Sequence, residues 1–138
     1  MARTKYGNSK VTFHGMKFDS KDEYHYYRYL EGKKSKGEIL NFELQPSYEL
    51  QPKFRDSQGK AIQAITYTPD YLIYHLDGSL EAVDVKSLGT ATQQGELRKK
   101  MFLYHFPHIR LTWICRNLKR ARIDGEWKKY EDLKAEKA

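Results

Sequence analysis

Two carboxylates and a lysine near the middle of the chain have the residue types and spacing that a metal-dependent reaction would need. Asp84 and Lys86 lie two positions apart in a strand-like segment, so their side chains leave the same face of it. Asp70 follows Pro69 at the start of the preceding strand-like segment. A pair of carboxylates can hold a hard cation such as Mg²⁺, which offsets phosphate charge and activates a water. Because a lysine beside that cation can orient the water and stabilise developing negative charge, the trio predicts metal-dependent phosphodiester cleavage.

The surroundings of Asp84 favour this interpretation over a purely structural one. An Asp-x-Lys triplet alone is more often a solvated strand face, with Asp70 then a simple turn residue. Asp84 and Lys86 alternate with the β-branched Val83 and Val85, which indicates a strand in the middle of a sheet, buried on one face and polar on the other. Charged side chains at such a place are costly unless they have partners or a function.

Glu23 is a further acidic candidate, on a helix predicted over residues 20–34. Ser20 and Glu23 match a capping box, which is a sufficient structural reason for this glutamate. Glu23, Tyr27 and Leu30 also follow the i, i+4, i+7 spacing of one helix face. We therefore expect Glu23 on the inward apolar stripe, where its carboxylate points at the sheet.

The relative position of the two aspartates depends on the hairpin that joins their strands near Gly78. A plain two-residue turn would place Asp70 opposite Val85, and the aspartates would then point to opposite faces. A three-residue loop over residues 76–78, with Gly78 in the left-handed region, shifts the register by one and brings Asp70 opposite Asp84. A bulge within the strand after Asp70, or a bend at its start, would have the same effect. We predict the shifted register, because the metal site requires it.

The charge of the chain favours a polyanionic partner. The net charge is +7, from 25 Lys and Arg against 18 Asp and Glu. A basic run follows the last predicted strand and can contact phosphates, although a solvated connector is an equal alternative. The candidate phosphate-binding residues are Arg116, Lys119, Arg120 and Arg122, together with Lys99 on the second predicted helix.

Length and composition indicate one soluble domain over residues 1–138, with a basic N-terminal arm at 1–10 and a helical tail at 123–138. We find no apolar run that could span a membrane, no secretory signal and a single cysteine, Cys115, so we expect a cytoplasmic protein. Helices are predicted over 20–34 and 96–106, the second ending before a proline. Strands are predicted over 11–13, 48–54, 61–68, 71–76, 80–86 and 109–115, with 39–44 either a strand or an extended entry. This order predicts an α/β or α+β fold with a central mixed sheet flanked by helices.

Taken together, these motifs resemble a known superfamily. Thr68-Pro69-Asp70-Tyr71 followed by Asp84-Val85-Lys86 resembles the PD-(D/E)xK nucleases, with Asp84 as the allowed variant of the second acid. Residues 18–23 and the Tyr- and Leu-rich helix after them resemble the first helix of its Holliday-junction-resolvase branch. Residues 44–52, Leu-Gln-Pro-Ser-Tyr-Glu-Leu-Gln-Pro, look like a stretch in a phage family of small resolvase-like nucleases. The resemblance covers about residues 5–115.

The resemblance implies a restriction-endonuclease-like fold and a homodimer that uses Mg²⁺ or Mn²⁺ to cut four-way or other branched DNA, in a host cytoplasm if a phage encodes it. It implies Asp70, Asp84 and the backbone carbonyl of Val85 as metal ligands, Glu23 completing the site directly or through water, and Lys86 positioning the attacking water. Many relatives carry one more polar residue on the following helix, a slot open here to Gln93, Gln94 or Lys99. Two alternatives remain: a transposon-end or restriction-like nuclease of the same superfamily, and an inactive basic DNA-binding module.

Overall fold

The computed structural model describes residues 10–13, 15–87, 92–117 and 126–137, which form eleven strands and three helices. In chain order these are β1 (Val11–Phe13), β2 (Met16–Phe18), α1 (Lys21–Ser35), β3 (Asn41–Leu44), β4 (Tyr48–Gln51), β5 (Phe54–Arg55), β6 (Ala61–Ile62), β7 (Ile65–Tyr67), β8 (Tyr71–Tyr74), β9 (Leu80–Val85), α2 (Gln93–His105), β10 (Ile109–Arg116), β11 (Trp127–Lys129) and α3 (Tyr130–Lys137). In this part of the chain no helix is long and apolar enough to cross a membrane.

A five-stranded mixed sheet forms the centre of the fold, in the order β11-β10-β9-β8-β3. β9 and β10 run parallel, and the other neighbours in this sheet are antiparallel. The predicted mixed α+β class is therefore confirmed. β9, which carries Asp84, is the middle strand, as its β-branched composition indicated.

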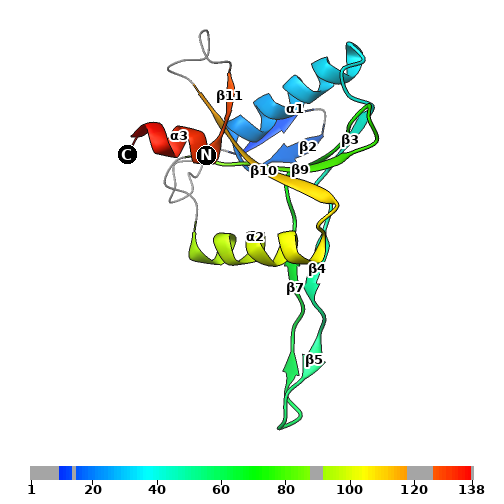
Figure 1. The fold of residues 1–138 in the computed structure, drawn as a ribbon, viewed down its shortest axis with the longest axis vertical. Coiled ribbons are helices and arrows are strands. Elements are labelled where there is room, and N and C mark those ends of the chain that lie inside the picture. The colour runs from blue at the N-terminus through cyan, green and yellow to red at the C-terminus, as the bar shows by residue number, and fades with distance from the viewer. Residues whose placement is uncertain (1–9, 14, 88–91, 118–125, 138) are drawn as a thin grey trace.

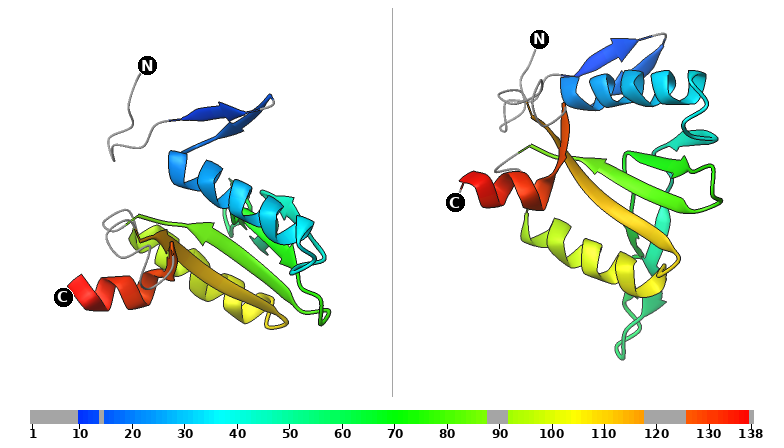
Figure 2. Two further views of the ribbon diagram at one scale, coloured as in Figure 1. Left: turned by 90° about the horizontal axis from the view of Figure 1, so that it is seen from above. Right: turned by 45° about the horizontal axis from the view of Figure 1, so that its top comes forward.

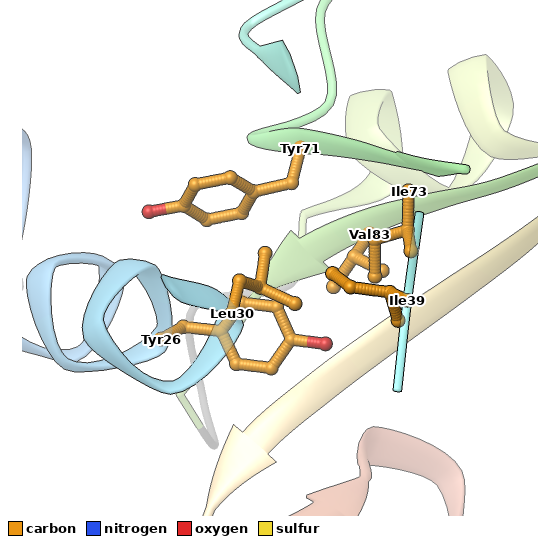
Figure 3. Packing of buried hydrophobic residues seen from close by; sticks show 6 residues of the cluster. All are labelled: Tyr26, Leu30, Ile39, Tyr71, Ile73 and Val83. Carbon is orange, nitrogen blue, oxygen red and sulfur yellow. The ribbon is translucent and has the colours of Figure 1, made fainter. Parts of the chain in front are cut away.

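Helices cover both faces of this sheet, with α1 on one side and α2 and α3 on the other (Figure 2). From α1, Tyr26 and Leu30 pack in one cluster with side chains of β8 and β9, among them Val83 (Figure 3). On the opposite face, Phe102 of α2 packs with Ala82. The face of β9 that carries Asp84 and Lys86 is polar as predicted, but at Ala82 it is also covered by α2, which the strand's own sequence does not reveal.

The first helix is capped as predicted. Its N-cap is Ser20, whose Oγ accepts a hydrogen bond from the Glu23 N–H at 3.1 Å. Glu23 and Leu30 are buried, as the stripe predicted, but the buried tyrosine is Tyr26 and not Tyr27. Tyr26 precedes Leu30 by one turn and faces the sheet, whereas Tyr27 is only partly buried and its ring lies 5.3 Å from that of Phe18.

Three local features differ from the predictions. β2 was not predicted, and it pairs with β1. α2 begins at Gln93 and not at 96, because the side chain of Thr92 caps it by accepting the Gly95 N–H at 3.0 Å. β11 replaces part of the predicted helical tail, because Trp127 packs edge-on against Tyr26, with ring centroids 4.9 Å apart.

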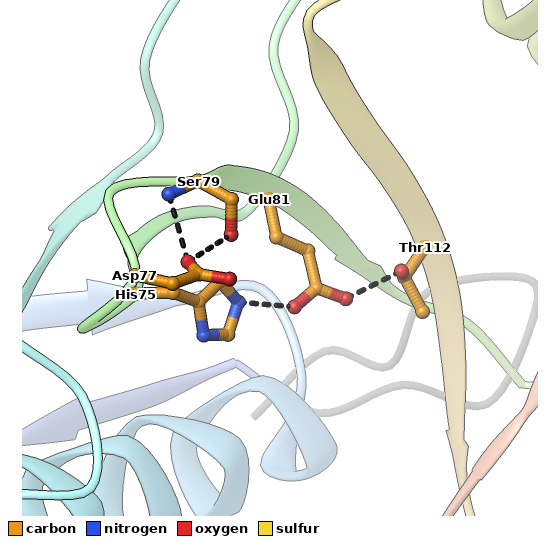
Figure 4. Close-up of polar contacts among 5 residues, drawn as sticks. All are labelled: His75, Asp77, Ser79, Glu81 and Thr112. Atoms are coloured by element: carbon orange, nitrogen blue, oxygen red, sulfur yellow. Dashed lines mark hydrogen bonds and ion pairs between the residues drawn. The ribbon is translucent and has the colours of Figure 1, made fainter.

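The β8–β9 hairpin has the shifted register that we predicted from the candidate metal site. Tyr71 pairs with Val83, so the preceding Asp70 falls opposite Asp84. The His75 N–H donates to the Ser79 carbonyl at 3.0 Å, which closes a three-residue loop, and Gly78 has φ +86°. Figure 4 shows this turn from the side, with the carboxylate of Asp77 accepting from Ser79. It also shows that Glu81, the other acid of β9, is held by His75 and Thr112 and so has a structural role at the far end of the strand.

A long two-stranded excursion leaves the sheet between β3 and β8; we call residues 48–67 the β ribbon. β4 pairs with β7 at its root, and β5 pairs with β6 beyond Pro52. Figure 1 shows the ribbon extending away from the body, with α2 beside its root. The predicted strands at 48–54 and 61–68 are each divided in two, and the first is divided at Pro52 because proline cannot donate to the ladder.

We predict that Gly78→Ala destabilises the protein by about 1 kcal/mol, because only glycine adopts a positive φ at little steric cost. Gly32→Ala is the matched control: this glycine lies within α1, a Cβ there would meet no atom within 4 Å, and its φ is not in the left-handed region. The control should stabilise the protein by roughly 0.5–1 kcal/mol through helix propensity. Urea unfolding measures both changes, and a neutral or stabilising Gly78→Ala would contradict the assigned turn.

Candidate active site

Asp70 and Asp84 are held together by hydrogen bonds at the N-terminal end of β8. The Asp70 N–H donates to Oδ1 of Asp84 at 3.0 Å, and the Val85 N–H donates to Oδ2 of Asp70 at 2.8 Å. Each aspartate thus binds the backbone of the other's strand, in place of the ladder hydrogen bonds that stop at this point. The two predicted metal ligands lie side by side in a fixed arrangement.

Glu23 reaches the same place from α1. Its side chain is 7% exposed, and the Tyr71 hydroxyl donates to its backbone carbonyl at 2.6 Å, which fixes the start of the helix against β8. Its carboxyl group shares a hydrogen bond with that of Asp70. The structure therefore brings together all three acids that the sequence predicted.

The crowding of these acids changes their protonation. Burial raises the pKa of Asp70 well above its ordinary value, and the negative charges of Asp84 and Glu23 raise it further. Burial also raises the pKa of Glu23, while the hydrogen bond with Asp70 opposes that rise. The hydrogen bond with Glu23 also raises the pKa of Asp70, so Asp70 takes up a proton more readily than an isolated aspartate.

Two aromatic residues that the sequence analysis did not single out orient Asp84. The Tyr67 hydroxyl donates to Oδ2 of Asp84, and Nε1 of Trp113 donates to the Tyr67 oxygen at 3.2 Å. Trp113 is the direct partner of Asp84 across the parallel β9–β10 pair. Burial and the Asp84 charge raise the pKa of Tyr67, so its hydroxyl stays protonated and remains a donor. Both oxygens of the Asp84 carboxylate are thereby fixed.

Lys86 lies on the face of β9 that carries Asp84, and its ammonium sits 4.7 Å from the ring centroid of Trp113. Lys99 of α2 lies over the same ring at 4.3 Å, and also 3.6 Å from the Glu131 carboxylate. Of the three residues left open for the slot after the lysine, Lys99 is therefore the one that contacts the same ring as Lys86, whereas Gln93 and Gln94 are exposed at the start of α2. Within the described residues Lys86 forms no ion pair, and its ammonium contacts the Trp113 ring.

The donor set suits a small hard cation. Over the described residues, no three His, Cys, Asp or Glu side chains are placed to hold a metal between them. Mg²⁺ needs only one or two carboxylates and keeps several waters, so Asp70 and Asp84 satisfy its usual requirement. The Val85 N–H points at Asp70, and in a strand the carbonyl of a residue points to the same side as its N–H. The Val85 carbonyl is therefore on the side where the resemblance places a third ligand.

The predicted phosphate-binding residues lie at the edge of the site or outside the described part of the chain. Arg116 ends β10, and its Nε donates to the Glu126 carboxylate at 2.8 Å, which partly neutralises its charge. Lys119, Arg120 and Arg122 lie outside the described residues.

We predict that Asp70→Asn stabilises the metal-free protein at pH 8. The folded-state pKa of Asp70 is raised, so the ionised side chain opposes folding, and this effect appears as pH rises through the folded pKa. Thermal unfolding in chelator should therefore show a gain in stability at pH 8 that vanishes towards pH 4. Asp132→Asn, at an exposed acid in the first turn of α3, is the control and should change little. A less stable Asp70→Asn at pH 8 would show that the ionised carboxylate supports the fold.

The comparisons with known proteins give a family but no activity. The model of a family described as "Protein of unknown function (DUF1064)" matches residues 3–122, which is most of the chain. No curated protein and no solved structure matches the chain. This protein therefore belongs to the DUF1064 family of proteins of unknown function.

Proposed function

We propose that this protein is a metal-dependent DNA endonuclease of the Holliday-junction-resolvase type, within the PD-(D/E)xK superfamily. The observation that carries the proposal is the reciprocal pairing of Asp70 and Asp84, with Glu23 bonded to Asp70 and Lys86 on the same strand face as Asp84. Buried acids that raise one another's pKa while a lysine stands beside them are typical of sites that bind a cation and handle a proton. The net charge of +7 supports a polyanionic substrate.

In this proposal each residue has a definite role. Asp70, Asp84 and the Val85 carbonyl would hold Mg²⁺ or Mn²⁺, which when bound offsets charge on the scissile phosphate and lowers the pKa of a water. Lys86 orients that water and stabilises the negative charge that develops on the phosphate. Glu23 completes the site, directly or through water. A homodimer would place two such sites on two strands of a branched substrate.

Tyr67 and Trp113 add preorganisation to this scheme. With both Asp84 oxygens held in place, the carboxylate need not reorient when the cation and substrate arrive. The same superfamily includes transposon-end and restriction-like nucleases, and an inactive DNA-binding module would share the fold. A comparison of cleavage of four-way junctions with cleavage of linear duplex of the same sequence separates a junction resolvase from these other nucleases. The metal dependence of cleavage separates an enzyme from an inactive DNA-binding module.

We predict that Mg²⁺ or Mn²⁺ supports cleavage of a labelled four-way junction and that Asp84→Asn lowers the rate by at least about 10²-fold. Binding should persist in the variant, because phosphate contacts come from other residues. Asp132→Asn removes one exposed carboxylate and should leave the rate unchanged. Near-normal cleavage by Asp84→Asn would rule out the assigned metal site.

Lys86→Ala should likewise lower the cleavage rate by about 10²–10³-fold with little effect on affinity, because the lysine acts on the developing charge and not on the ground state. Lys36→Ala, at an exposed lysine just after α1, is the matched control. Ca²⁺ should support binding but not cleavage, since its looser coordination does not hold water and phosphate in line. Full activity in excess chelator would exclude a metal-dependent enzyme.

A further inference from the structure

The outer half of the β ribbon has no structural role in the body of the fold. At its root, Tyr48 packs on Phe102 and Phe106 of α2, with ring centroids 5.1 Å apart in each case, and Leu50 is buried. Beyond the root, β5 and β6 pair only with each other, and Phe54 is 45% exposed. Figure 1 shows this half standing clear of the sheet and helices. An isolated two-stranded ribbon is only marginally stable in water, which indicates that a binding partner stabilises this one.

The tip of the ribbon is preorganised and cationic. Oδ1 of Asp56 accepts the N–H groups of Gln58 and Lys60, each at 2.9 Å, and Arg55 donates to the Gly59 carbonyl at 2.8 Å. The turn is therefore shaped by its own hydrogen bonds.

The cations at this tip are open to solvent. Lys53, Arg55 and Lys60 are exposed, and the single acid among them, Asp56, is turned toward backbone N–H groups. A narrow projection that presents three cations is complementary to a phosphate backbone.

The ribbon is also connected directly to the candidate active site. β7 ends at Tyr67, which bonds Asp84, and Asp70 follows three residues later. Gly59 at the tip lies eight positions before Tyr67, so at about 3.3 Å per residue the tip lies at most roughly 26 Å from the root. At about 3.4 Å per phosphate along one strand, this length corresponds to roughly eight base pairs.

We propose that the β ribbon is a second DNA-binding element, which lies along the duplex next to the scissile phosphate and contacts its backbone up to about eight base pairs away through Lys53, Arg55 and Lys60. The major groove of B-form DNA admits a two-stranded β ribbon, so the shape fits as well as the charge. The proposal rests on the proposed nuclease function for the position of the scissile phosphate. It adds a requirement for duplex of a minimum length on one side of the cut.

The test compares Lys53→Glu/Lys60→Glu with the matched control Lys34→Glu/Lys36→Glu, which changes exposed lysines at the far end of α1 by the same charge. Affinity for a four-way junction is measured in Ca²⁺ over a range of salt concentrations. The ribbon variant should bind at least about tenfold more weakly, and its slope of log affinity against log salt should be smaller by about two, because each lost phosphate contact removes roughly 0.9. The control should keep most of the affinity, and both variants should unfold at the temperature of the wild type.

A second series shortens the duplex arms of the junction from about 14 to about 5 base pairs. Wild-type affinity should fall when the arms become shorter than about eight base pairs, whereas the ribbon variant should be insensitive to arm length. Equal losses of junction affinity in the two variants, or a wild-type affinity independent of arm length, would overturn the ribbon proposal. Neither result would contradict the proposed cleavage activity. A ribbon variant that only changes the oligomeric state would also overturn it, in favour of a protein contact. A wild type that neither binds nor cuts DNA would instead remove the proposed function itself.

Discussion

The structure depends on the two hydrogen bonds that hold Asp70 and Asp84 together, which we call the lock. The two aspartates bind each other's strands at the place where β8 separates from β9, so the end of the sheet and the candidate site are the same feature. This lock exists only because the hairpin has a three-residue loop with Gly78 at positive φ. A register one residue different would turn Asp70 to the other face and leave each carboxylate without its backbone partner.

The lock also sets up an electrostatic conflict within the site. Burial and neighbouring negative charge raise the pKa of Asp70, and Glu23 from α1 adds to the conflict. A fold of this size has only about 5–15 kcal/mol of stability, and such repulsion acts against it. A bound cation would remove the conflict, which connects the stability of the protein to its proposed chemistry.

The parts of the site that follow from local sequence could be predicted. The Asp-x-Lys spacing placed Asp84 and Lys86 on one face, and the helical stripe placed Glu23 towards the sheet. Tyr67 and Trp113 could not be found in this way. Trp113 meets Asp84 through the parallel pairing of β9 with β10, whose paired residues lie about thirty positions apart in the chain, and Tyr67 reaches Asp84 from β7, which pairs in a different sheet. For the same reason the cover that α2 provides over β9 and the edge strand β11 were missed, since both are set by tertiary packing and not by local pattern.

The central claim is that Asp70, Asp84 and the Val85 carbonyl form a divalent-cation site. The most direct measurement is the anomalous difference map of crystals of the wild-type protein soaked in Mn²⁺. The account predicts one strong peak between the two aspartates, on the side of the Val85 carbonyl, and its loss in crystals of Asp84→Asn. A map with no peak there, or with a peak that survives in Asp84→Asn, would contradict the account.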